Sequence, residues 1–253
     1  MSNTTSVSDK LIWIDVGTHE AQEYRAVFDS GFRHAYKMTK YLIRKILLSR
    51  SLNKQLFSDV VSITKARKNL RRHKKRFLFF FVEPNSLLFF EDKVYKKNVY
   101  CFNCALTDDA QVLFKKLFIS NADPRSQGNS LLATKASVSE AEFSVTLGIP
   151  AKSFFTAVKE SVEEKHKRYR VILRLNCEGF EDSIIYSARQ IFGADLVAVF
   201  GSLDDVRKLR GDDQAQRLEA FLRAECLEFV RFSPQMESWC MALRKLEQIT
   251  DGA

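Results

Sequence analysis

Two segments of this chain show the same succession of signals: an apolar run, a turn that contains glycine, and a helical pattern. The first run, LIWIDV at 11–16, leads into Gly17, and the second, RVILRL at 170–175, leads into a turn with Gly179. A third run, FLFFFV at 77–82, also precedes a turn. Such runs are typical of buried strands. Strands that alternate with helices predict an α/β fold in which a mostly parallel sheet carries helices on both faces.

The segment at 33–76 interrupts this alternation with an excess of positive charge. It holds fifteen Lys or Arg and a single acid, Asp59, whereas the whole chain has a net charge of +9. Its apolar residues recur at helical spacing. A chain of 253 residues that is 45% hydrophobic can bury one sizeable core. We therefore expect a single domain over 1–253, with two basic amphipathic helices inserted at 33–76.

The sequence has no pattern of secretion or membrane insertion. Its five cysteines are odd in number and scattered, which favours a reducing compartment over a disulfide framework. The first ten residues lack the basic start and apolar core of a signal peptide, and no apolar stretch reaches the roughly 18 residues of a spanning helix. We expect a cytoplasmic protein without a transmembrane segment. The basic helices would also allow the protein to lie peripherally at a membrane surface.

Polar residues and a glycine follow the predicted strands. In a parallel α/β sheet, ligands bind where loops leave the carboxyl ends of the strands. Asp15 and Gly17 end the first strand, and Glu83 ends the strand at 77–82. A carboxylate can accept hydrogen bonds from both hydroxyls of a ribose, and glycine lets the backbone approach a ligand closely. Glu83 is therefore the predicted ribose-binding residue.

Four short motifs follow one another along the chain: I-D-V-G-T-H-E-A, F-V-E-P-N-S, N-C-A-L-T-D and L-N-C-E-G-F-E. Their order resembles the FkbM-like family of class I S-adenosylmethionine-dependent methyltransferases, whose motifs are like D-V-G-A-N-x-G, F-E-P-N-P, N-x-A-L-x-D and I-D-V-E-G-x-E. The resemblance covers residues 11–31 and 77–200. It implies a Rossmann-like class I methyltransferase fold with S-adenosyl-L-methionine as the cofactor.

The resemblance also assigns roles to individual residues. It implies a cofactor site made of Asp15, Gly17, Thr18, Glu83, Asn103, Ala105, Leu106 and Asn176. Within that site, the turn after the first strand would lie near the methionine end of the cofactor, Glu83 on the ribose, and the corner at 103–106 against the adenine. Glu178 and Glu181 would face the substrate.

The sequence departs from the family pattern at two places. Thr18, His19 and Ala21 stand where the family has a small residue, Asn and Gly, and Asn176 stands where it has Asp. Ala is the least disruptive replacement in a helix, so we expect Ala21 at an ordinary helix start. An amide cannot act as a general base and ligates a hard cation poorly, so no metal is expected at Asn176. An imidazole titrates near neutrality, which makes His19 the preferred catalytic base and Glu178 the alternative.

These observations lead to one main hypothesis and two others. The main one is an O-methyltransferase that acts on a hydroxyl of a sugar, a glycan or another small polar metabolite. The departures from the family pattern also allow a non-catalytic binding or assembly module with the same fold. For 33–76, three interpretations stay open: solvated surface helices, a platform for an anionic ligand or membrane surface, and nucleic-acid contact. The last would make the protein a nucleic-acid methyltransferase.

Overall fold

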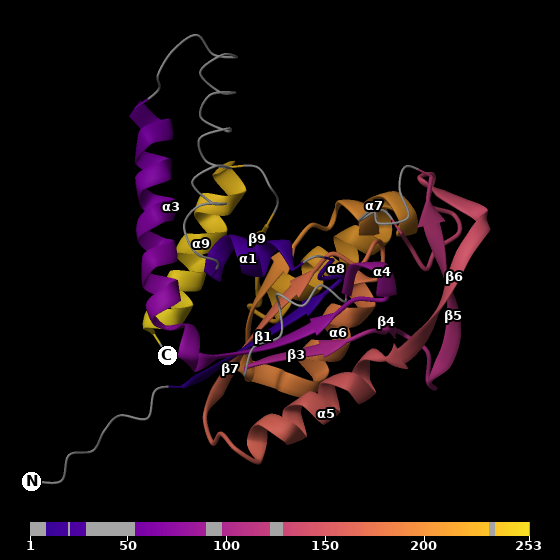
Figure 1. Ribbon diagram of the computed structural model, residues 1–253, viewed down its shortest axis with the longest axis horizontal. Helices are drawn as coiled ribbons and strands as arrows, with labels where there is room; N and C mark the ends of the chain where they lie inside the picture. The colour runs from indigo at the N-terminus through magenta and orange to yellow at the C-terminus, as the bar shows by residue number, and fades with distance from the viewer. Residues whose placement is uncertain are drawn as a thin grey trace, which may run out of the picture.

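The computed structural model contains two β-sheets, with helices packed against the larger one (Figure 1). It describes residues 9–19, 21–28, 54–89, 98–121, 129–232 and 236–252. The first of the two predicted basic helices, together with the rest of 33–53, lies outside the described residues.

Six parallel strands form the main sheet. In spatial order they are β3 (Val99–Phe102), β2 (Phe77–Val82), β1 (Lys10–Val16), β7 (Tyr169–Leu175), β8 (Leu196–Gly201) and β9 (Glu228–Arg231). Each neighbouring pair is parallel. The predicted α/β class with a mostly parallel sheet is therefore confirmed. Chain order reverses between β1 and β7, which is the switch point where doubly wound sheets bind ligands.

Helices cover both faces of this sheet, as predicted. Successive side chains of a strand point to opposite faces, so Leu11 and Trp13 belong to one buried cluster while Ile12 and Ile14 belong to the other. The first cluster is covered by α1 (Gln22–Phe28), α3 (Lys54–Arg72) and α9 (Met236–Asp251). The second is covered by α5 (Ala151–Glu163), α6 (Glu181–Phe192) and α8 (Asp212–Ala224). Shorter helices are α4 (Ser86–Phe89), α7 (Asp204–Arg210), and the 3-10 turns η1 (Lys74–Arg76) and η2 (Gly193–Asp195).

Helix α3 is part of the helical layer of the sheet. Its residues Ile63, Ala66 and Leu70 are at most 2% exposed and belong to the same cluster as Trp13. The described part of 33–76 is therefore an amphipathic helix whose apolar side packs on the main sheet. Because α3 leads through η1 directly into β2, its C-terminal half lies at the amino ends of the parallel strands.

The second sheet has three strands and adjoins the main one. Its order is β4 (Ala105–Thr107), β6 (Val138–Pro150) and β5 (Leu113–Ser120), with β5 and β6 antiparallel. Residues 143–150 of β6 pair with β5 and, at their end, with β4. Leu117 on β5 is buried, whereas Phe114 on the other face of the same strand is 80% exposed.

None of the helices within the described ranges is long and apolar enough to cross a membrane.

The packing of α3 can be tested with two substitutions on the same helix. Leu70→Ala should lower the free energy of unfolding by about 2–5 kcal/mol, because Leu70 is fully buried and its truncation leaves a cavity. Val61→Ala should change it by less than about 0.5 kcal/mol, because Val61 is 51% exposed. Urea unfolding of both variants checks this expectation. Equal effects would show that α3 does not cover the sheet.

Candidate functional site

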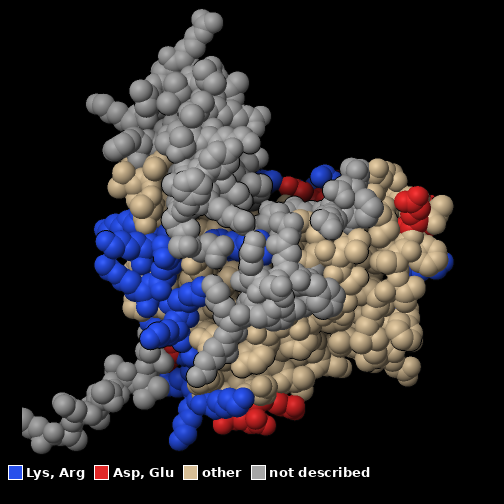
Figure 2. Space-filling view, in the orientation of Figure 1, with Lys and Arg blue, Asp and Glu red and all other residues tan. Residues whose placement is uncertain are grey.

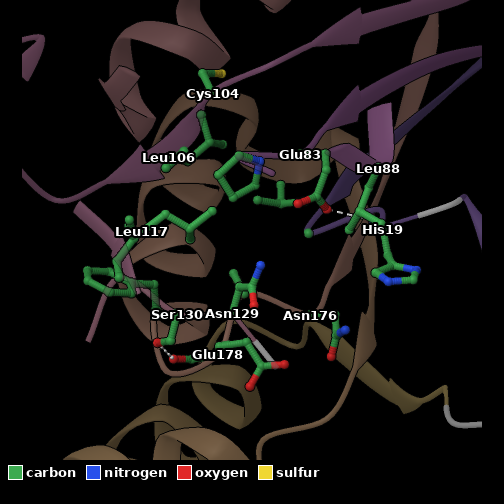
Figure 3. A pocket seen from close by; sticks show the side chains of 17 residues that line it. His19, Glu83, Leu88, Cys104, Leu106, Leu117, Asn129, Ser130, Asn176 and Glu178 are labelled. Atoms are coloured by element: carbon green, nitrogen blue, oxygen red, sulfur yellow. Dashed lines mark hydrogen bonds between the residues drawn. The ribbon is translucent and has the colours of Figure 1, made fainter. Parts of the chain in front are cut away.

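A cavity of about 50 Å³ lies at the carboxyl ends of β1, β2 and β7, beside the second sheet. Figure 3 shows the side chains that surround it, with Glu83 facing Leu106 and Leu117 across the centre and with Asn176 and Glu178 below. Of the residues predicted from the sequence, those that line it are Gly17, His19, Glu83, Ala105, Leu106, Asn176 and Glu178. Asp15, Thr18, Asn103 and Glu181 do not line it. The structure thus brings most of the predicted site together at the switch point of the sheet.

Gly17 allows the ends of β1 and β7 to approach each other. Its φ is +72°, in the left-handed region that favours glycine. A Cβ atom at this position would lie 1.9 Å from the carbonyl oxygen of Asn176. The Asn176 backbone N–H donates to the carbonyl of Val16 at 2.9 Å, which holds the two strand ends together. No side chain fits between them.

The backbone amides of the described residues in the first turn are all used within the protein. The N–H groups of Gly17 and Thr18 both donate to the carbonyl of Val82, at 2.9 and 3.2 Å. The N–H of His19 donates to Oε2 of Glu83 at 2.7 Å, the bond drawn in Figure 3. A phosphate-binding turn needs amides that point at the ligand. This turn therefore does not form a phosphate cradle.

Ala21 has a different conformation from the one expected. Its φ is +52°, so it is a left-handed residue that precedes α1 and not an ordinary helical one. The turn closes through the Ala21 N–H, which donates to the Thr18 carbonyl at 2.8 Å. A non-glycine residue in this conformation costs roughly 1–2 kcal/mol. The buried Ala21 methyl group, 2% exposed and in the same cluster as Tyr24, offsets part of that cost.

The Glu83 carboxylate is buried, yet it can accept more hydrogen bonds than the two that the backbone donates to it. Its Oε1 accepts the N–H of Asn85 at 2.9 Å and its Oε2 accepts the N–H of His19, which leaves further lone pairs on each oxygen. The residue is 6% exposed. Burial raises the pKa of Glu83 to about 7, against the opposing effect of the two backbone N–H donors. Glu83 can therefore accept hydroxyl donors from a ligand in the cavity.

Asn103 fastens the loop that carries Glu83. Its side-chain amide donates to the carbonyls of Glu83 at 2.8 Å and of Pro84 at 3.3 Å. The predicted adenine corner is thus split: Asn103 holds the loop, whereas Ala105 and Leu106 line the cavity. Leu88, Cys104 and Leu117 complete an apolar wall that the sequence analysis did not assemble. They come from α4, the turn before β4, and β5, so no local pattern in the sequence joins them.

Asp15 lies behind the cavity in a buried ion-pair network. Its Oδ1 accepts Nη1 of Arg174 at 3.0 Å, and the same nitrogen donates to the Gly17 carbonyl at 2.8 Å. Nη2 of Arg174 pairs with Glu23 on α1 at 2.6 Å. Burial raises the pKa of Asp15 to about 6, and the Arg174 guanidinium opposes this. Asp15 therefore supports the first turn through Arg174.

Arg174 itself was missed in the sequence, although one signal pointed to it. It is a charged residue within the apolar run of β7, and it is 4% exposed. A buried charge requires a partner. The register of the sheet places Arg174 directly beside Asp15 on β1.

Glu181 organises the loop after β7. Its Oε1 accepts the N–H of Cys177 at 3.0 Å, and its Oε2 accepts the N–H of Gly179 at 2.9 Å. It is 1% exposed, and burial raises its pKa to about 7. Its carboxylate is thus bonded like that of Glu83, but it faces the loop and not the cavity.

Glu178 reaches the cavity from the same loop. It forms an ion pair with Lys135, and its carbonyl accepts the hydroxyl of Ser130 at 3.4 Å. Burial raises the pKa of Glu178, and Lys135 opposes the shift. Asn129 and Ser130 also line the cavity, so the chain between β5 and β6 contributes one of its walls. Lys135 and Asn129 were not predicted, because nothing local in the sequence places that loop over the β7 turn.

Burial disfavours the thiolate form of the two thiols at the cavity. Burial raises the pKa of Cys104 to about 12 and that of Cys177 well above its ordinary value, so both stay protonated at neutral pH. All five cysteines are free. Within the described ranges, no group of three or more His, Cys, Asp or Glu side chains could hold a metal ion.

Comparison with known proteins found no matching family model, no matching curated protein and no matching solved structure. The fold and site define this chain as an α/β protein with a cavity at the switch point of a parallel sheet, the place where such sheets bind ligands.

The close approach of β1 and β7 leads to a matched pair of glycine substitutions. Gly211→Ala should cost about 1–3 kcal/mol through backbone strain alone, because Gly211 has a φ of +91° and no atom near its would-be Cβ. Gly17→Ala should cost about 3 kcal/mol more, or prevent folding, because its Cβ would overlap the Asn176 carbonyl. Chemical denaturation measures the difference, and equal losses would mean that the strand ends are farther apart.

Proposed function

We propose that this protein is an S-adenosylmethionine-dependent methyltransferase that transfers a methyl group to a hydroxyl oxygen of a sugar, a glycan or another small polar metabolite. The observation that carries the proposal is the Glu83 carboxylate at the end of β2. It lines a cavity at the switch point and keeps lone pairs for a ligand. The apolar wall formed by Leu88, Ala105 and Leu106 lies in the same cavity and suits a flat base.

The residues of the cavity fit an adenosyl group by their chemistry. Glu83 suits the two ribose hydroxyls, and the carboxylates of Glu83 and Glu178 favour a cationic ligand such as a sulfonium. No Lys or Arg is among the described residues that line the cavity, and the amides of the first turn are taken, so a phosphorylated cofactor suits it poorly. The cavity is smaller than the roughly 300 Å³ of typical ligand sites, so its walls must separate for a ligand of this size.

Catalysis in such a site depends mainly on alignment. When bound, S-adenosylmethionine supplies an electrophilic methyl group on a positively charged sulfur. Glu83 would hold the ribose, and the loop with Asn176 and Glu178 would hold the acceptor opposite it. Holding two reactants in line supplies a large part of the rate.

The proton of the acceptor hydroxyl must pass to a base of the protein as the oxygen takes the methyl group. His19 and Glu178 both line the cavity and can receive it. In Figure 3 the His19 imidazole lies at the side of the cavity away from Leu106 and Leu117. Glu178 has the raised pKa of a buried carboxylate and is oriented by Lys135. Both residues are assigned as candidate bases, as the sequence predicts.

A non-catalytic binding or assembly module is the second candidate function. One observation favours it: Asp15, which family resemblance assigns to the methionine end of the cofactor, is 0% exposed and paired with Arg174. A cavity with only the ribose and base contacts would bind a nucleoside without aligning a methyl group.

Two buried glutamates provide a matched test of the cofactor site. Glu83→Gln should weaken binding of S-adenosylmethionine and S-adenosylhomocysteine at least about tenfold, because the amide loses a charged acceptor for the ribose. Glu181→Gln is the control, since Glu181 also accepts two backbone N–H groups but does not line the cavity. Calorimetric titration of the wild-type protein should give micromolar affinity. Absence of binding to either ligand would rule out the cofactor assignment and favour the binding module. Equal losses in the two variants would contradict the role of Glu83.

The raised pKa of Glu83 gives this test a pH dependence. The carboxylate is the better acceptor, so affinity should rise from pH 6 to pH 8 in the wild type and stay level in Glu83→Gln. Stability should change in the opposite direction. Between the ordinary glutamate value and about 7, the folded state keeps a proton that the unfolded state has lost, so unfolding becomes easier as pH rises. The slope is about 1.4 kcal/mol per pH unit for each such group.

A screen of sugars and metabolites with labelled S-adenosylmethionine should first identify an acceptor. Single substitutions then show which of the two candidate bases takes the proton. Of the variants His19→Ala and Glu178→Gln, the one that removes the proton acceptor should lower turnover by about 100-fold or more. Its affinity for the cofactor should be retained. Unchanged turnover in both variants would remove these two assignments and leave the cofactor site intact.

A further inference from the structure

The C-terminal part of α3 and the 3-10 turn that follows it expose only cations to solvent. Every exposed residue between positions 65 and 75 is Lys or Arg. They are Lys65, Lys68, Arg71, Arg72 and Lys75, which together are called the cationic face of α3. At about 100° per residue, the helical members of this set lie within one arc, opposite the buried residues Ile63, Ala66 and Leu70. Figure 2 shows Lys and Arg gathered over this part of the molecule.

Within the described ranges, no acidic side chain pairs with the cationic face. None of its five residues forms an ion pair with another residue that the structure describes. Solvated helices usually alternate charges three or four residues apart. Here the neighbours at those spacings within α3, such as Lys68 with Arg71 and Lys68 with Arg72, are of like sign. Each such pair costs a few tenths of a kcal/mol, which a bound polyanion would relieve.

The position of this face separates it from the candidate site. The C-terminal half of α3 and η1 lead into the amino end of β2, whereas the cavity lies at the carboxyl ends. Lys10, at the start of β1, donates from Nζ to the carbonyl of Lys75 at 2.9 Å and extends the positive charge along the amino ends of the strands. The cationic face therefore cannot serve as a lid over the cavity. A partner of this face would bind on a side of the molecule away from the cavity.

The chemistry of the face indicates the kind of partner. A helix that inserts into a membrane surface uses its apolar face, but the apolar face of α3 is buried against the sheet. From Lys65 to Lys75, no apolar residue is exposed. With a rise of 1.5 Å per residue, the cations from Lys65 to Arg72 form a narrow row about 10 Å long, and Lys75 follows in η1. A row of this shape matches a line of backbone phosphates better than a broad bilayer plane. No exposed aromatic residue is available in this row to stack on a base.

We propose that the cationic face of α3 binds the phosphodiester backbone of nucleic acid without reading its sequence. The contacts are those of Lys and Arg with phosphate oxygens, which give affinity and a dependence on salt but no base specificity. This interaction would hold the protein on a polyanion while the cavity at the opposite ends of the strands stays accessible. It does not depend on the proposed methyltransferase activity.

The test compares two variants that lose the same charge. In one, the row is neutralised as K65Q/K68Q/R72Q/K75Q. In the control, four exposed cations on α5, α7 and α8 are replaced as K152Q/K208Q/R217Q/R223Q. Fluorescence anisotropy with a labelled 20-nucleotide oligouridine, at 50 to 200 mM salt, measures affinity. Circular dichroism checks that both variants fold.

The expected result is wild-type binding that weakens with salt. The row variant should bind at least about tenfold more weakly at 50 mM salt, and the slope of log K against log salt should be about 3 units less steep, since each lost phosphate contact contributes about 0.7. The control should stay within about twofold of the wild type. The proposal is overturned by absence of wild-type binding at 50 mM salt, by equal losses in both variants, or by binding to phosphatidylserine vesicles without binding to the oligonucleotide.

Discussion

The buried pairing of Arg174 with Asp15 is the interaction on which the candidate site depends. It places two charges inside the main sheet, at neighbouring positions of β7 and β1. Arg174 also bonds the Gly17 carbonyl and Glu23, so a single guanidinium joins two strands, the first turn and α1. With that turn held, the His19 N–H reaches Glu83 on the next strand. Loss of one partner from a buried pair is costly, typically about 3–5 kcal/mol, because the other charge is left without compensation.

Glu83 and Glu181 show how the same local chemistry serves two purposes. Each follows a strand end, is buried, and accepts two backbone N–H groups in a tight loop. The two residues differ in what their carboxylates face. Glu83 faces the cavity between the main sheet and the second sheet, whereas Glu181 faces only its own loop. Glu83 is therefore placed to meet a ligand in the cavity, whereas Glu181 supports its loop.

Helix α3 joins two roles in a similar way. Its apolar side covers the sheet, and its opposite side presents the cationic face. The direction of the β1-to-β2 connection sets that face at the amino ends of the strands, away from the cavity. The basic segment that dominates the charge of the chain is therefore, in its described part, a structural helix with a separate surface.

The sequence by itself determined the α/β class, the strands of the main sheet, and the presence of Gly17 and Glu83 at a common edge, because apolar runs, helical spacing and strand-end residues are local signals. The tertiary structure decided which polar residues face the cavity. Arg174 finds Asp15 across 159 positions of the chain, and Lys135 finds Glu178 across 43. Such pairings depend on strand register and on how the second sheet folds against the first. A side chain at a strand end can therefore be placed at the right edge from sequence, but its direction, toward ligand or toward protein, is set by partners distant in the chain.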